Sequence, residues 1–276
     1  MSDVVLTFDT DWAPDFVVRD TLELLGNTPA TFFVTDEISA GLVKGIPTIE
    51  MGIHPNFLKK SSHGESYHEV LKTVLGFAPD AKIVRTHNLF QDTTVLDLFV
   101  EYNMQTDMSL LEYKNPRPKP FHYWNGLIRM PYNFEDDVAC LRGEINSWFN
   151  CKDTMPTLVC DFHPIHVYLN SESLGSYMRL RERGTMLALK PSDIDPLVNQ
   201  TSFGARDLLA LLLDGVKAND HHLFSVTELI KKTGVEGWAE PVPTTLTTQR
   251  STEQPKYWLS GSSHGIPHIW GCLFSV

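Results

Sequence analysis

The sequence is poor in cysteine, and its few cysteines lie far apart. The 276 residues contain four of them, and none forms a C-x-x-C pair: Cys140, Cys151, Cys160 and Cys272. The absence of such pairs excludes a zinc ribbon and a thioredoxin-type redox motif. We expect free thiols, as in a protein of the reducing cytoplasm.

Long apolar runs and basic clusters are also missing. The N-terminus lacks the basic stretch and apolar core of a secretory signal. No segment approaches the roughly 18 apolar residues of a membrane span. Asp and Glu outnumber Lys and Arg by 34 to 23, which gives a formal net charge of -11. We therefore expect a cytoplasmic protein that has neither a nucleic acid nor a membrane as its partner.

The chain does contain enough apolar residues for a large core. Hydrophobic residues make up 42% of 276 positions, which suits one α/β barrel or two small domains. Apolar patterns predict strands at Asp3–Phe8, Ala30–Val34, Thr48–Ile53, Lys82–Arg85, Gln105–Met108, Leu127–Met130 and Thr157–His163. Helical spacing is found at Ala13–Leu25, Ser66–Phe77, Thr93–Tyr102 and, as the final helix, Phe203–Ala218. This alternation predicts parallel βαβ units, and about seven of them favour an α/β barrel over an open sheet.

The C-terminal segment has a different composition. From Glu240 onward Pro, Thr, Ser and Gln dominate, which is typical of a linker or extended arm. We therefore expect a barrel domain over residues 1–238 and an extended arm over residues 239–276.

Polar side chains follow several predicted strands, where α/β barrels carry their functional residues. Asp9 and Asp11 come directly after the first strand, so one can bind a metal while the other acts as a base. A simple turn or helix cap would also use aspartates here. His54 closes the third strand and is a candidate metal ligand through its neutral imidazole.

Two later strand ends add an arginine and a histidine. Arg85 can orient a carboxylate through its planar guanidinium, or form an ordinary surface ion pair. His163 can act as a general acid, or bond the backbone as a structural residue. Each signal is weak alone, but four strand ends in this order indicate a mononuclear metal hydrolase. One Asp and two His ligands leave positions open for water and substrate, and suit Zn²⁺ or a similar ion.

These motifs resemble those of the NodB-homology polysaccharide deacetylases. The family's Thr-Phe-Asp-x-Asp motif is matched by Thr7–Asp11, and its Ala-Thr-Phe-Phe-Val strand by Ala30–Val34. Its Glu-x-Gly-x-His segment is matched by Glu50–His54, its arginine motif in part by Arg85, and its late His-Pro motif by His163-Pro164. The resemblance covers about residues 3–235. It implies a distorted TIM-like (β/α)7 barrel that removes acetyl groups from an amino sugar or polysaccharide precursor.

The resemblance also implies a role for each residue. Asp11 and His54 would bind the metal, which we expect to be Zn²⁺, with Co²⁺ or Ni²⁺ as alternatives. Asp9 would accept the proton of the attacking water, and Arg85 would keep Asp9 ionised. His163 would protonate the leaving amine.

The chain departs from the family pattern at one metal ligand. The family places a second histidine four residues after the first, where this chain has Leu58. We expect His63, on the lengthened loop, to supply the third ligand, with His87 as the alternative. This form resembles a divergent subgroup linked to bacterial surface-polysaccharide synthesis.

Further residues could contact the substrate. Trp12 and Tyr132 could stack on sugar rings or simply pack. Asn56, two residues after His54, is a further predicted substrate contact. His166 is another, and it could also support His163 or pack beside it. The acidic run Glu135–Asp137 either lines the cleft or forms a solvated turn. Two other functions fit the same motifs: hydrolysis of a cyclic amide or imide, and an inactive deacetylase-like protein that binds carbohydrate. The oligomeric state is not predicted.

Overall fold

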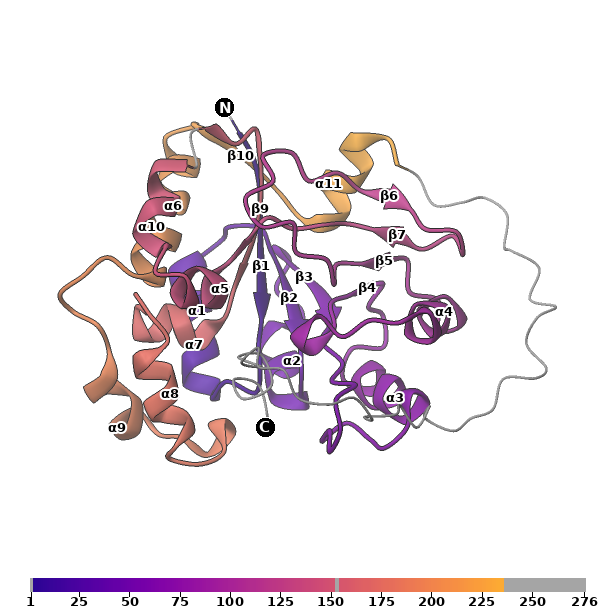
Figure 1. Cartoon of the computed structure of the whole chain (residues 1–276), viewed down its shortest axis with the longest axis horizontal. Helices are drawn as coiled ribbons and strands as arrows, with labels where there is room; N and C mark the ends of the chain where they lie inside the picture. Colours follow the sequence, from indigo (N-terminus) through magenta and orange to yellow (C-terminus); the bar gives the residue numbers. More distant parts are fainter. Residues whose placement is uncertain (1, 152–153, 236–276) are drawn as a thin grey trace, which may run out of the picture.

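A curled, mostly parallel β-sheet forms the centre of the molecule. The computed structural model describes residues 2–151 and 154–235 (Figure 1). The hydrogen-bonded strand order is β6-β7-β5-β4-β3-β2-β1-β9-β8, and β10 pairs with the first half of β1. The strands are β1 (Ser2–Asp9), β2 (Ala30–Val34), β3 (Ile49–Ile53), β4 (Ile83–Val84), β5 (Thr106–Asp107), β6 (Phe121–His122), β7 (Ile128–Arg129), β8 (Phe134–Glu135), β9 (Thr157–Phe162) and β10 (His221–Phe224).

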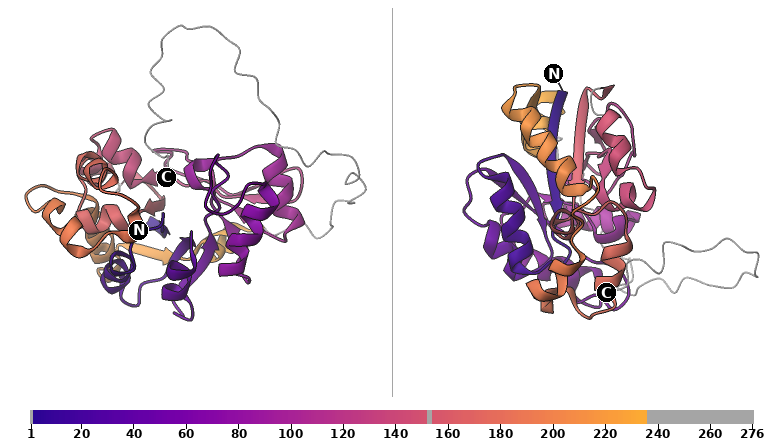
Figure 2. Two further views of the ribbon diagram at one scale, coloured as in Figure 1. Left: turned by 90° about the horizontal axis from the view of Figure 1, so that it is seen from below. Right: turned by 90° about the vertical axis from the view of Figure 1, so that its left-hand side faces the viewer.

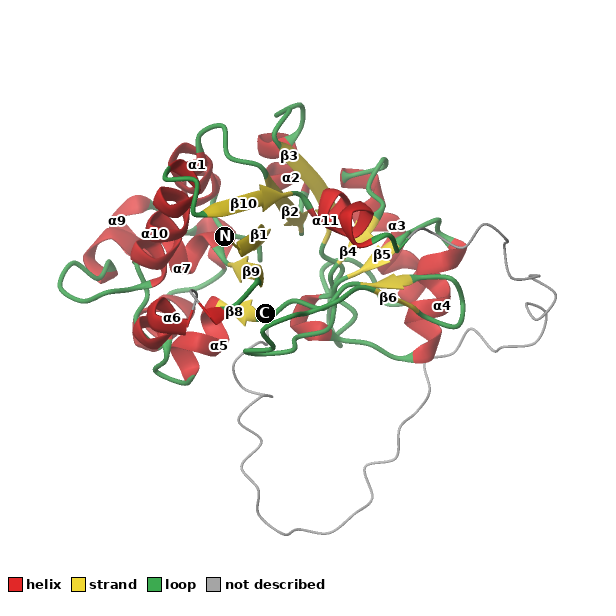
Figure 3. Cartoon of the chain, turned by 90° about the horizontal axis from the view of Figure 1, so that it is seen from above, coloured by secondary structure: helices red, strands yellow, loops and turns green. Residues whose placement is uncertain are grey.

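The curvature of this sheet is that of a half-barrel. Seen from above, the strands follow an arc and most helices lie outside it (Figure 3). Each pairing between these strands is parallel except that of β6 with β7. The predicted distorted α/β barrel is thereby confirmed. The carboxyl ends of β1, β3, β4 and β9 consequently meet on one side of the sheet.

Helices connect and cover the strands. They are α1 (Asp15–Leu25), α2 (Glu37–Val43), α3 (Tyr67–Phe77), α4 (Thr93–Glu101), α5 (Asp136–Leu141), α6 (Ile145–Cys151), α7 (Pro164–Leu169), α8 (Gly175–Arg181), α9 (Pro191–Ile194), α10 (Ala205–Lys217) and α11 (Val226–Thr233), with short 3-10 turns η1 (His87–Leu89), η3 (Met186–Ala188) and η4 (Asp195–Leu197). Two groups of helices lie toward opposite ends of the longest axis of the molecule, with α3 and α4 at one end and α5–α10 at the other (Figures 1 and 2).

Local sequence explains where several helices begin. Asp36 and Asp92 accept backbone N–H groups at the starts of α2 and α4. Ser66 forms a capping box with Glu69 at α3, and the same pattern recurs at α11. These caps satisfy amide groups that a helix start would otherwise leave without partners.

One glycine is required by the packing of β3. A Cβ atom at Gly52 would lie 2.7 Å from the Phe33 ring and 2.9 Å from the Ile83 carbonyl oxygen. Any side chain there would force β3 away from its neighbours. Gly52 therefore fixes the strand that ends directly before His54.

Most predicted elements appear within two residues of their expected bounds. The prediction that Phe203–Ala218 is the final helix is wrong, because β10 and α11 follow α10. Strand β10 is short and pairs only with the start of β1, so it gave little periodic signal. No helix among the described residues has the length and apolar character needed to cross a membrane. The predicted arm over residues 239–276 lies outside the described residues.

Candidate active site

Asp9 is the last residue of β1, and a strained turn directly after the strand carries Asp11. Asp11 and Trp12 have φ values of 43° and 53°, in the left-handed region that few non-glycine residues adopt. Thr35, just beyond β2, holds this turn: its hydroxyl accepts the Trp12 N–H at 3.0 Å and bonds the Thr10 hydroxyl at 3.0 Å. Strained backbone kept in place by such bonds is often functional.

Asp11, His54 and His87 form a cluster that could hold a metal ion. Asp11 Oδ1 lies 3.1 Å from His54 Nε2 and 3.0 Å from His87 Nδ1. Candidate ligand atoms of all three residues lie within 4.8 Å of one another. Burial alone would raise the pKa of Asp11, but His87 and His54 outweigh it and hold the pKa well below its usual value.

The cluster is assembled by backbone bonds between neighbouring strand ends. His54 N–H bonds the Val34 carbonyl at 2.9 Å, and His87 N–H bonds the Pro55 carbonyl at 3.0 Å. His87 is thus tied to the residue that follows His54. Both rings are almost fully buried.

These residues fit a divalent ion. Ligands placed about 2.0–2.1 Å from a tetrahedral ion lie roughly 3.3 Å apart, close to the separations within the cluster. Two imidazoles and one carboxylate are a donor set typical of zinc and related ions.

Arg85 links Asp9 to two residues of the barrel interior. Its Nη1 donates to Asp9 Oδ1 at 2.9 Å and also to Asp161, while Nη2 donates to the Thr7 hydroxyl at 2.9 Å. The fully buried guanidinium lies between the Phe33 ring, at 4.4 Å, and the Tyr132 ring, at 4.3 Å. Despite burial, Asp161 and Asp9 raise the pKa of Arg85, so it stays charged. Arg85 therefore holds Asp9 in one orientation.

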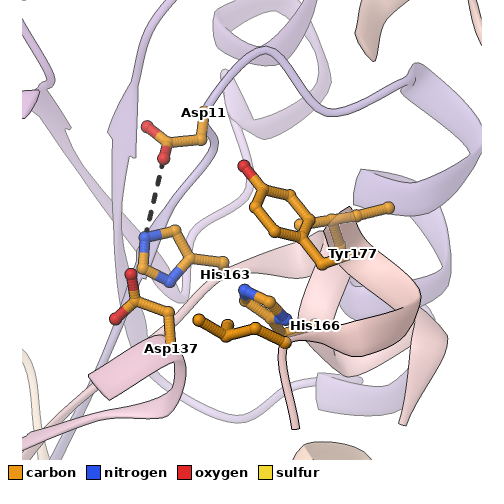
Figure 4. A pocket seen from close by; sticks show the side chains of 7 residues that line it. Asp11, Asp137, His163, His166 and Tyr177 are labelled. Carbon is orange, nitrogen blue, oxygen red and sulfur yellow. Dashed lines mark ion pairs between the residues drawn. The ribbon is translucent and has the colours of Figure 1, made fainter. Parts of the chain in front are cut away.

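His163 occupies the opposite side of the site and is held by a carboxylate. Asp136 accepts both its backbone N–H, at 2.8 Å, and its ring Nδ1–H, at 2.7 Å. Burial lowers the pKa of His163, but Asp136, Asp137 and Asp11 outweigh it and raise the pKa well above its usual value. Its Nε2 lies 3.6 Å from Asp11 Oδ2 (Figure 4). A charged imidazole with Nε2 directed at the cluster is suited to donate a proton.

A pocket opens beside His163. It is lined by Asp11, Asp137, His163, Ile165, His166, Leu174 and Tyr177. Figure 4 shows Asp137 on one side of His163, and His166 and Tyr177 on the other. Asp137 is almost fully buried, and its Oδ1 has no hydrogen-bond partner. Burial raises the pKa of Asp137 to about 6 and lowers that of His166 to about 4.

The structure does not bring His63 into the cluster of Asp11, His54 and His87. Its Nε2 bonds the Thr35 carbonyl at 2.7 Å, and its Nδ1 accepts the Asn56 N–H at 3.1 Å. Because both nitrogens bond the backbone, His63 holds the loop after β3. Of the two predicted alternatives for the third ligand, His87 is the one that lies with Asp11 and His54.

The other predicted substrate contacts are divided between pocket and core. His166 lines the pocket. Trp12 is buried with its ring 5.3 Å from that of His63 and 5.2 Å from that of His87, and does not line this pocket. Tyr132 is fully buried beneath Arg85. Asn56 Oδ1 accepts the Leu58 N–H at 2.9 Å, which shapes its own loop.

Three residues of the site were not predicted in these roles. Asp136 orients His163, Asp161 contacts Arg85, and Tyr177 lines the pocket. The acidic run Glu135–Asp137 was the only signal for the first. Tyr177 follows a segment with no strand or helix prediction, so nothing in the sequence indicated its position.

Known proteins match this chain over most of its described length. Residues 6–181 match the family model of the WbmS-like polysaccharide deacetylases. A solved structure from Bordetella bronchiseptica, described as a polysaccharide deacetylase involved in O-antigen biosynthesis, is 39% identical with a TM-score of 0.67. That match covers 76% of this chain and 90% of the other. A polysaccharide deacetylase structure from Mycobacterium smegmatis is 16% identical with a TM-score of 0.45, covering 80% and 92%.

No curated protein matches the chain. The family model nevertheless covers more than half of the residues of this chain. The matched range also contains the Thr7–Asp11, Ala30–Val34, Glu50–His54 and His163-Pro164 motifs. The chain belongs to the WbmS-like polysaccharide deacetylase family.

Proposed function

We propose that this protein removes an N-acetyl group from an amino sugar of a bacterial surface polysaccharide or its precursor, by metal-dependent hydrolysis. The observation that carries the proposal is the placement of Asp9 and His163 beside the cluster of Asp11, His54 and His87. Asp9 Oδ2 lies 3.4 Å from His54 Nδ1, and His163 Nε2 lies 3.6 Å from Asp11 Oδ2. A carboxylate and a charged imidazole thus flank candidate metal ligands, as amide hydrolysis requires.

The reaction divides the proton transfers between these two groups. Arg85 occupies Asp9 Oδ1, which leaves Oδ2 to accept a proton from the attacking water. The water oxygen bonds the acetyl carbon, and the C–N bond breaks. His163 Nε2 donates its proton to the leaving nitrogen, so the products are acetate and the free amine. Asp136 keeps the His163 ring oriented during this transfer.

Asp11, His54 and His87 would hold the metal. A bound divalent ion would supply polarisation of the water and of the acetyl carbonyl. We propose Zn²⁺ because the donor set is one carboxylate and two imidazoles, with Co²⁺ and Ni²⁺ as alternatives.

Similarity to the Bordetella protein supports a surface-polysaccharide substrate. The pocket adds a place for the sugar, because Asp137 can accept a hydroxyl hydrogen bond and Tyr177 offers a ring beside it. Both side chains lie next to His163, where the amide nitrogen would be (Figure 4).

The test is acetate release by protein reconstituted with Zn²⁺ or Co²⁺. The substrates are a panel of N-acetylated sugars, sugar nucleotides and delipidated O-antigen. We expect release of acetate, with one metal bound per chain. The Asp9→Asn variant is the matched control, because it should keep the metal and lose the activity. Release by that variant at the wild-type rate would refute the mechanism.

Two other results would assign a different function. Opening of cyclic amides or imides without any acetate release would place the protein with hydrolases of that class. A chain that binds no metal and releases no acetate would favour the remaining alternative, an inactive deacetylase-like protein that binds carbohydrate.

A further inference from the structure

The 3-10 turn that carries His87 has an unfavourable backbone. Asn88 and Leu89 have φ values of 55° and 50°, so two consecutive non-glycine residues lie in the left-handed region. Such a conformation costs free energy and persists only where surrounding contacts hold it. Those contacts come from β5, which pairs with β4, and from β7, which pairs with β5.

Ser109, just beyond β5, holds the start of the turn. Its fully buried hydroxyl accepts the Thr86 N–H at 2.9 Å, one residue before His87. The same hydroxyl donates to Asp107 Oδ1 at 2.6 Å, and the Ser109 N–H bonds that oxygen at 3.1 Å. Asp107 therefore fixes the direction in which Ser109 presents its lone pairs to Thr86.

Arg129 on β7 completes this arrangement. It faces Asp107 across the β5–β7 pair, and its Nε lies 2.5 Å from Asp107 Oδ2. Its Nη2 donates to Gln91 Oε1 at 2.6 Å, and Gln91 Nε2 donates to the Ser109 carbonyl at 2.9 Å. The turn is thus held at both ends, by Thr86 before His87 and by Gln91 after it.

We infer that Ser109, Asp107, Arg129 and Gln91 are positioning residues for a metal ion, because they fix His87 beside Asp11. This inference rests on the proposed function, and specifically on His87 as the third ligand. With Leu58 in place of the family's second histidine, the third ligand comes from the end of β4, and its strained turn needs contacts besides the single backbone bond from His87 to Pro55. Residues that orient a metal ligand typically change metal affinity roughly 10- to 100-fold when altered.

The experiment titrates metal-free protein with Co²⁺ and follows the visible absorption of the bound ion. We expect Ser109→Ala and Asp107→Asn to weaken Co²⁺ binding by roughly 10- to 100-fold. At saturation their spectra should match the wild type, because His87 still ligates the ion. His87→Gln should bind Co²⁺ with an altered spectrum.

Asp20→Asn is the matched control, because it removes the same charge from another Asp–Arg pair. Asp20 contacts Arg206, which joins α1 to α10 rather than to the turn. If Ser109→Ala and Asp107→Asn bind Co²⁺ as Asp20→Asn does, the inference is refuted. Should either variant unfold, the exposed Gln91 can be changed instead, and Gln91→Ala should also weaken Co²⁺ binding, by roughly tenfold.

Failure of the proposed function gives a different result. A wild-type chain that binds no Co²⁺, or a His87→Gln variant that binds it with wild-type affinity and spectrum, would refute the metal site itself. Normal binding by wild type together with unaffected positioning variants would refute only the inference.

Discussion

Carboxylates and imidazoles are arranged differently around Asp11 and around His163, on the two sides of the site. On one side a single carboxylate, Asp11, faces two imidazoles, those of His54 and His87. On the other side the imidazole of His163 is surrounded by carboxylates, of which Asp136 is bonded to it directly, and the His166 ring lies 5.8 Å away.

This difference separates two kinds of chemistry. Several imidazoles around one anion favour a bound cation, because neutral imidazoles donate lone pairs to it. Several anions around one imidazole favour its protonated form, which can then donate a proton. A change on one side should therefore leave the chemistry of the other side intact.

The largest effect is expected from Asp11→Asn. This change removes the only carboxylate of the cluster. We expect the loss of bound metal and a fall in kcat/KM of roughly a thousandfold, equivalent to about 4 kcal/mol. Metal analysis of the purified variant and acetate-release kinetics measure the two results. A variant that still carries one metal per chain would contradict the assignment of the cluster.

His163→Gln should affect the proton donor and leave the metal in place. We expect kcat to fall by roughly 10²- to 10⁴-fold, which is the usual contribution of a general acid. Metal content should equal that of the wild type. Loss of the metal in this variant would mean that the two sides are not separable.

Asp136→Asn tests how the imidazole of His163 is oriented, without removing that imidazole. The amide can still accept the His163 backbone N–H but no longer carries the charge that stabilises the imidazolium. We expect kcat to fall by roughly 10- to 100-fold with KM little changed. Steady-state kinetics separate the two constants, and a change confined to KM would contradict an orienting role.

The smallest effect is a pH dependence of stability that originates outside both sides. Burial lowers the pKa of His63 from 6.5 to about 4, with the Thr35 bond opposing that change only in part. Between pH 6.5 and about pH 4, His63 binds a proton more readily in the unfolded chain than in the folded one. The free energy of unfolding therefore falls as the pH falls through this range. Between pH 7 and pH 5 this should remove about 2 kcal/mol.

His63→Gln should flatten this pH dependence. Urea unfolding at pH 7 and pH 5 measures it, with the exposed His68→Gln as a control for the loss of a histidine. If His63→Gln and wild type lose the same stability on acidification, the buried histidine is not its source.

Strong local signals made part of this molecule predictable. Asp9, Asp11 and His54 follow apolar runs long enough to be recognised as strands, so their meeting at one end of the sheet followed from parallel topology. Arg85 was predictable for the same reason. His163 was recognised from its Pro164 partner and the strand before it.

Other contacts depend on tertiary structure that sequence distance does not encode. His63 is closer in sequence to His54 than His87 is, yet its bonds to Thr35 and Asn56 direct it away from Asp11. Asp136 follows β8 (Phe134–Glu135), where Phe134 stands alone between Asn133 and Glu135 and forms no apolar run that would predict a strand. Of the two roles considered for Tyr132, stacking on a sugar or packing, the structure shows packing, because its ring lies on the buried Arg85 guanidinium.

The three candidate ligands follow three separate strands, β1, β3 and β4, and this has a consequence for folding. A histidine at Leu58 would have placed two ligands in one loop. With His87 instead, an ion would cross-link three strand ends, much as a disulfide joins distant parts of a chain. An ion that binds the folded chain and not the unfolded chain stabilises the fold, and above Kd this stabilisation grows with the logarithm of the metal concentration. The thermal stability of the barrel, as well as its chemistry, would then depend on the supply of metal.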